Sequence, residues 1–237
     1  LDFPNYWALV KNDTPILQSF ATSDPSTKGL VKAVDTSWYT KDAKEYVIKT
    51  PSQLFGFAMK AMQDNFQGKT VKLGANINVS SLGVNWIPIG TRDKVFKGTF
   101  DGQGYTISGV THKSDSQDIG LFGSIDNTAV LKNFRLVDST FEYYSEEGNK
   151  KEMKIWLGSV CADMRGDLEN IYSNALVISN GCRVGGIAGM PNGSKGSDGN
   201  LTTSTIKNCW FDGEVRLHGR YARFAGGIAG QSMQGTI

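Results

Sequence analysis

The sequence predicts an all-β protein built as a right-handed parallel β-helix, a solenoid in which strands stack coil upon coil. Glycine supplies 28 of the 237 residues, about 12% of the chain. The average share in proteins is about 7%. Six of these glycines divide the stretch from Val95 to Ile125 into short β-branched and aromatic pieces, which is typical of strands joined by corners. Similar segments then recur in the second half. The right hand is expected because parallel crossovers strongly favour it.

The recurring segments form two sets. The first set has small residues beside apolar ones and comprises residues 119–123, 157–161, 184–189 and 225–230. The second set comprises residues 131–134, 168–171 and 206–209. Aligned by eye, the first set gives an inward column of Phe122, Val160, Ile187 and Ile228 and a small-residue column of Gly123, Cys161, Ala188 and Ala229.

One column of the second set is asparagine, at Asn133, Asn170 and Asn208. An amide both donates and accepts, so stacked copies can hydrogen-bond one another as a structural ladder. The alternative is three unrelated surface asparagines.

In chain order, residues 1–22 are expected to hold two short strands around a turn. They are interpreted as N-terminal strands or as the end of a preceding repeat unit. Residues 23–45 are less hydrophobic and are expected to be a linker into the repeats. A strand is predicted at Glu45–Lys49, and residues 46–237 are interpreted as the β-helix, with its last repeat cut short at the C-terminus.

A helix is predicted over residues 51–65. Thr50 is a suitable N-cap, Pro51 suits the first helical position, and Gln53 completes a capping box. Apolar residues then recur at helical spacing. We expect this helix to cover the open end of the stack. Further strands are expected at residues 70–73, 77–79 and 86–90.

The totals exclude several classes of protein. With 25 basic and 23 acidic residues the charge is too balanced for an electrostatic nucleic-acid binder. No apolar run reaches the ~18 residues of a membrane span. Three cysteines do not suggest a disulfide framework, and two histidines without zinc spacing predict no metal site.

The segments Trp86–Gly90, Phe96–Gly109 and Ile119–Gly123 resemble the GLUG-motif repeat proteins of bacteria, as do the preceding helix and the strand at 70–73. The resemblance runs from about Val47 to the C-terminus. It implies a secreted or cell-surface bacterial protein with a β-helical shaft, of the kind found in adhesin-like proteins and beside some immunoglobulin A-cleaving peptidases. It implies no catalytic residues.

Two places have candidate binding chemistry. Asp101-Gly102-Gln103-Gly104 offers oxygens to calcium, with an ordinary Asp-Gly turn as the alternative, so no cofactor is predicted. The stretch 141–147 combines aromatic rings with carboxylates, and Trp156 follows it. Together they are interpreted as a glycan site. This site comprises Tyr143, Tyr144, Glu146, Glu147 and Trp156, with Trp210, Tyr221 and Arg223 elsewhere. The alternative is that these rings pack beneath the loop.

The predicted function is a non-enzymatic surface module, an adhesin stalk or binding surface for host or community glycans or surface proteins. No nucleophile elbow or zinc-protease motif is present. Two alternatives remain. One is a carbohydrate-active β-helix enzyme such as a polysaccharide lyase. The other is a structural domain accompanying a surface peptidase.

Overall fold

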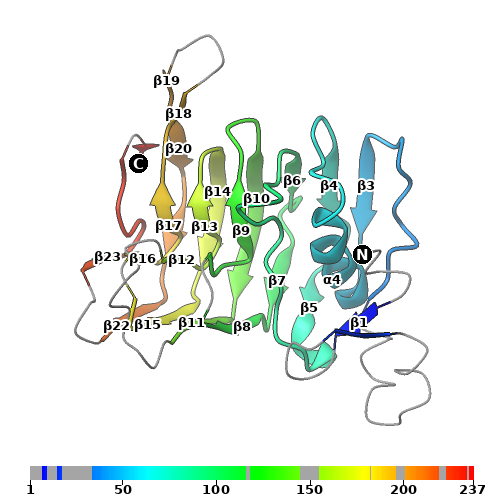
Figure 1. The fold of residues 1–237 in the computed structure, drawn as a ribbon, viewed down its shortest axis with the longest axis horizontal. Helices are drawn as coiled ribbons and strands as arrows, with labels where there is room; N and C mark the ends of the chain where they lie inside the picture. Colours follow the sequence, from blue (N-terminus) through cyan, green and yellow to red (C-terminus); the bar gives the residue numbers. More distant parts are fainter. Residues whose placement is uncertain are drawn as a thin grey trace.

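The computed structural model describes residues 34–115, 118–144, 155–181, 183–193, 202–218, 223–233 and 235–237, and the backbone of 7–9, 15–17, 194–195 and 201. Within these ranges the protein is all-β with parallel sheets, as the sequence predicts, and it has one α-helix and one short 3-10 helix, η1 (Val79–Leu82). Figure 1 shows the strands side by side along the long axis, from β3 at one end to β22 and β23 at the other.

The largest sheet takes strands from successive repeats, each pairing in parallel with the next. Its main path runs through β3 (Glu45–Ile48), β4 (Thr70–Leu73), β6 (Thr99–Asp101), β10 (Val130–Val137), β14 (Asp167–Ser173), β20 (Ser204–Lys207) and β24 (Gly235–Thr236). Three shorter strands flank this path, namely β5 (Ile77–Asn78), β7 (Thr106–Ser108) and β21 (Trp210–Phe211).

Three smaller parallel sheets follow the same order of repeats. One consists of β8 (Thr111–Ser114), β11 (Thr140–Tyr143), β15 (Leu176–Ser179) and β22 (Glu214–Leu217). The others are β9 (Phe122–Ile125), β13 (Cys161–Met164) and β17 (Ala188–Pro191), and β12 (Trp156–Gly158), β16 (Arg183–Gly185) and β23 (Phe224–Gly226). Successive repeats thus add parallel strands to these sheets in chain order, although not every repeat adds a strand to every sheet.

Antiparallel pairing among the described strands is confined to two small hairpins. β1 (Trp7–Leu9) pairs with β2 (Pro15–Leu17), where the sequence predicts two short strands. β18 (Ser194–Lys195) pairs with β19 (Leu201–Thr202) between β17 and β20. Neither hairpin interrupts the parallel pairing of the repeats.

The predicted helix is α4 (Pro51–Ala61), which ends four residues earlier than expected. The Thr50 hydroxyl accepts from the Gln53 amide at 3.2 Å, and the Gln53 side chain accepts from the Lys49 amide at 2.8 Å. The helix cannot continue because Asp64 and Asn65 bond the backbone two residues further on, as turns do. α4 lies at the N-terminal end of the sheets (Figure 1).

Strand pairing corrects part of the sequence alignment. Phe122 pairs with Cys161, not with Val160, although Cys161, Ala188 and Ala229 do share a column. Ile119 pairs with Leu157, so the first repeat has two residues in the intervening turn where the second has three. The predicted strand at 86–90 is also wrong, since Ile89 alone forms a bridge there. Pro88 has no N–H to donate, and Gly90 has φ +73°.

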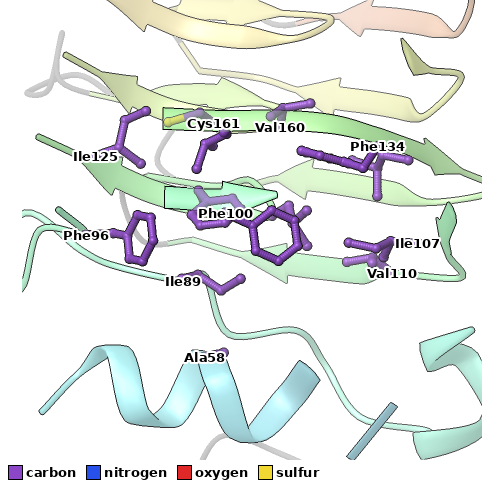
Figure 2. Close-up of a cluster of buried hydrophobic side chains, with 14 of the residues drawn as sticks. Ala58, Ile89, Phe96, Phe100, Ile107, Val110, Ile125, Phe134, Val160 and Cys161 are labelled. Atoms are coloured by element: carbon purple, nitrogen blue, oxygen red, sulfur yellow. The ribbon is translucent and has the colours of Figure 1, made fainter. Parts of the chain in front are cut away.

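Aromatic rings fill the interior next to α4. Phe57 stacks on Phe100 at 5.9 Å between centroids, and Phe100 meets Phe122 and Phe134 at 5.4 Å each. Figure 2 shows Phe96, Phe100 and Phe134 pointing into the space between the sheets, above Ala58 of the helix. The helix therefore joins the same core that the strands enclose.

Candidate ligand-binding face

The outer side of the largest sheet has three parallel rows of polar and aromatic side chains, one residue per repeat. Strand β10 shows why. Leu131, Phe134 and Leu136 are buried, while Lys132, Asn133 and Arg135 lie outside. Two outer residues are adjacent because Asn133 has a left-handed backbone, φ 59°, which bends the strand. We call this surface the binding face.

The first row is the asparagine column. The Asn170 amide donates to the Asn133 carbonyl oxygen at 3.0 Å, and the Asn208 amide donates to that of Asn170 at 3.2 Å. Asn133 in turn donates to the Asp101 carboxylate at 3.1 Å. All three asparagines have positive φ, which asparagine tolerates better than most residues. The structure therefore places these side chains in one hydrogen-bonded row.

The second row alternates in charge along Asp101, Lys132, Glu169 and Lys207. Lys132 lies 3.7 Å from Asp101, and Lys207 lies 3.6 Å from Glu169. The Asp101 carboxylate also accepts from the Gln103 amide at 3.0 Å, as in an Asp-Gly turn. Burial opposes ionisation of Asp101, but these hydrogen bonds outweigh it and hold its pKa below the usual value.

The third row runs through Arg135, Tyr172 and Trp210, which pair across adjacent strands. The Arg135 guanidinium lies 4.6 Å from the centre of the Tyr172 ring. The Tyr172 hydroxyl lies 3.3 Å from a carboxylate oxygen of Asp212. Trp210 is 68% exposed and is the most exposed large apolar side chain in the described part of the chain.

The sequence reasoning named Trp210 but did not place it beside Arg135, Tyr172 and Asp212. A signal for the row was present, since Arg135, Tyr172 and Trp210 each come two residues after an aligned asparagine.

The predicted glycan site, on the stretch at residues 141–147 that we call the insertion, is only partly described. Glu146, Glu147 and Tyr221 lie outside the described residues. Tyr144 is 50% exposed, but Tyr143 is 2% exposed, since it lies with Phe141 on the inner side of β11. Tyr143 therefore cannot offer its ring to a sugar, and this assignment is corrected. Arg223 is exposed at the start of another strand and is not part of the binding face.

Trp156 belongs to a different, largely buried cluster. The Arg92 guanidinium lies 3.8 Å from the Trp156 ring centre and forms a 2.7 Å ion pair with Asp118. Burial raises the pKa of Asp118 to about 7, against the opposing effect of Arg92. Asp163 is fully buried, which raises its pKa. Its carboxylate is held by three side chains, Arg165 at 3.3 Å, Ser124 at 3.2 Å and Asn192 at 3.2 Å. A substrate cannot reach Asp163 in this arrangement.

Two kinds of feature are not found in the part of the chain that the structure describes. Among the described residues, no three histidine, cysteine, aspartate or glutamate side chains are grouped to hold a metal ion. Within the same ranges, no helix has both the length and the apolar character that crossing a bilayer requires.

Comparison with known proteins gives two matches. No family model matches the sequence. The chain is 34% identical over 98 residues to halomucin from Haloquadratum walsbyi, a match that covers 41% of this chain but 1% of halomucin. A crystal structure of a Bacteroides ovatus protein, provisionally named an immunoglobulin A1 protease, aligns with a TM-score of 0.58 at 20% identity. That alignment covers 83% of this chain and 64% of the other. At this identity the second match shows a shared fold.

Proposed function

We propose that the chain is a right-handed parallel β-helix module of a secreted or cell-surface bacterial protein, and that it binds carbohydrate on the binding face without catalysing a reaction. The β-helix is supported by the order of pairing, since strands from successive repeats pair in parallel with one another in all four of the larger sheets. The hand follows from the strong preference of parallel crossovers.

The observation that carries the proposal is the exposed Trp210 ring. An exposed indole offers an apolar, electron-rich face, on which the C–H groups of a pyranose ring can pack. Asp212, Asn208 and Lys207 are exposed nearby in sequence and can hydrogen-bond hydroxyl groups. Scattered apolar residues are normal on surfaces, but here the ring extends a row of aligned side chains.

A glycan array probed with the purified chain, followed by calorimetry on the hits, tests this. We expect Trp210→Ala to weaken binding at least fivefold, because stacking on one ring contributes about 1–3 kcal/mol in comparable aromatic contacts. Tyr144→Ala is the matched control, since it removes an exposed ring from the insertion and should leave binding unchanged. Equal affinity for Trp210→Ala and the parent chain would exclude this site, and a loss confined to Tyr144→Ala would move it to the insertion.

An extracellular setting is supported by the two matches. One match is named as a mucin and the other as an immunoglobulin A1 protease, and both names fit a secreted or surface protein. A glycan-rich environment is also where a carbohydrate-binding module would work.

The match to the Bacteroides protein favours a second candidate, a structural domain beside a peptidase. Such a domain would bind no glycan, so an empty array would favour it over the first. A polysaccharide lyase is less well supported, because Asp118 and Asp163, the acids with raised pKa, are buried and paired with arginine.

A further inference from the structure

A second, separate site is suggested by a polar cleft at the N-terminal end of the molecule, remote in sequence from the binding face. The cleft has a volume of about 440 Å³. It is lined by three segments, the loop before β3, the end of α4 and the loop that follows the helix. Its lining residues are Tyr39, Lys41, Asp42, Lys60, Gln63, Asp64, Asn65 and Lys69.

One acid of the cleft, Asp64, is ionised and already has a cationic partner. Asp64 accepts from the Tyr39 hydroxyl at 2.6 Å and from the Phe66 amide at 2.8 Å, and it forms an ion pair with Lys69. Burial opposes ionisation of Asp64, but these donors outweigh it and keep its pKa below the usual value. Lys69 also donates to the Lys41 carbonyl oxygen at 2.8 Å. Asp64 and Lys69 thus compensate each other's charge.

The remaining lysines have no carboxylate partner among the described residues. The Lys60 ammonium lies 5.0 Å from the centre of the Tyr39 ring and donates to the Gln63 side chain at 3.2 Å. Lys41 is exposed at the rim. The charges of Asp64 and Lys69 compensate each other. The other charged lining residues are two lysines, Lys41 and Lys60, and one acid, Asp42, so the lining has a surplus of positive charge.

We propose that this cleft binds an acidic sugar unit, with the sugar carboxylate between Lys60 and Lys41. The volume lies within the range of small-ligand sites, about 300–1,000 Å³. A carboxylate accepting from ammonium groups forms charge-assisted hydrogen bonds, which are stronger than neutral ones. The Asp42 carboxylate and the amides of Gln63 and Asn65 line the same cleft and suit ring hydroxyls better than an apolar ligand.

The proposal can be tested by NMR titration of the isotopically labelled chain with glucuronate, glucose, acetate and N-acetyl-aspartate amide as probes. We expect glucuronate to shift the amide signals of Lys60–Asn65 with a measurable Kd, and the other probes to bind at least fivefold more weakly. Lys60→Gln replaces the ammonium group with a neutral polar group, and we expect it to weaken glucuronate binding at least fivefold. Lys94→Gln removes the same charge from an exposed loop elsewhere and should have no effect.

Three results would overturn the proposal. If Lys60→Gln binds glucuronate as Lys94→Gln does, then Lys60 is not a ligand. Equal binding of glucose would remove the role of the carboxylate, and equal binding of N-acetyl-aspartate amide would remove the role of the sugar. None of these results affects the binding face, which is tested through Trp210.

Discussion

Each asparagine of the row meets two requirements at once. At Asn170 the backbone is left-handed, φ 55°, and the side chain donates to Asn133 and accepts from Asn208. A side chain with Cβ pays about 1–2 kcal/mol for this conformation, although asparagine adopts it more readily than most residues. Each hydrogen bond adds about 0.5–1.5 kcal/mol, with the low end applying at an exposed site.

Asn170→Ala should therefore lower the free energy of unfolding by about 2–3 kcal/mol, because it removes both amide bonds and places alanine in the left-handed region. Asn170→Gly is the matched control. Glycine accepts the backbone conformation, so it should lose only the hydrogen bonds and be the milder of the two changes. Urea unfolding measures both. Two variants of equal stability would mean that the backbone term is negligible.

Residues that repeat could be located from the sequence, and residues whose surroundings come from elsewhere could not. The asparagines lie in one row because each occupies the same position within its own repeat. Tyr143 was misassigned because its burial depends on which side of β11 faces the core. Trp156 meets Arg92, which lies in a non-repeating loop far earlier in the chain, so no local pattern links the two.

At the level of elements, α4 is held between the core and the preceding loop. Seven of its residues are buried, including Gly56. A Cβ at Gly56 would lie 2.1 Å from the Asp35 carbonyl oxygen, which is backbone and cannot rotate away. The loop itself is fixed by the Asp35 amide, which donates to the Ser52 carbonyl oxygen at 2.9 Å.

Gly56→Ala should therefore displace the loop that carries Trp38 or shift the helix, with a loss of about 2 kcal/mol or more, the usual range for overpacking a core. Trp38 stacks on Phe66 and meets Tyr46 edge to face, so its displacement should change the near-ultraviolet circular dichroism. Gly227→Ala is the control, since a Cβ there meets nothing within 4 Å. A parent-like spectrum and stability for Gly56→Ala would refute this packing.

The turn between paired strands explains the error in register. A difference of one residue between the first turn and the later ones is invisible to an alignment by eye, because Leu121, Phe122 and Val160 are all apolar. The pairing is decided by the backbone of the following strands, where Ser124 pairs with Asp163 and Ile125 with Met164. Fold class thus follows from composition and repetition, whereas the register follows from contacts between repeats.

For the whole molecule, two buried groups give opposite dependences of stability on pH. The pKa of His112 is lowered by burial from 6.5 to about 4. Above pH 6.5 His112 is neutral in both states, and stability falls as pH drops towards 4, where the unfolded chain alone takes up the proton. The pKa of Asp118 is raised to about 7. Its folded form retains the proton, so stability falls as pH rises from about 4 to 7.

The two slopes should largely cancel between pH 4 and 6.5, and single variants should separate them. We expect His112→Leu to become more stable towards pH 4, by about 1–3 kcal/mol relative to its value at pH 6.5, because His112 then no longer opposes the Asp118 slope. Asp118→Asn should show the opposite trend. Thermal unfolding across this range measures both, and parallel pH profiles for the two variants would contradict the assignment.

The amide row also has a direction. Every hydrogen bond in it is donated in the same direction, from Asn208 to Asn170, from Asn170 to Asn133 and from Asn133 to Asp101. The Asp101 carboxylate only accepts, so it can end the series. Exchanging the first repeat with a later one would leave a carboxylate facing an amide oxygen in mid-row. The repeats look alike in sequence, yet they are not interchangeable, and a protein engineer who lengthens the stack would have to insert new units after Asp101.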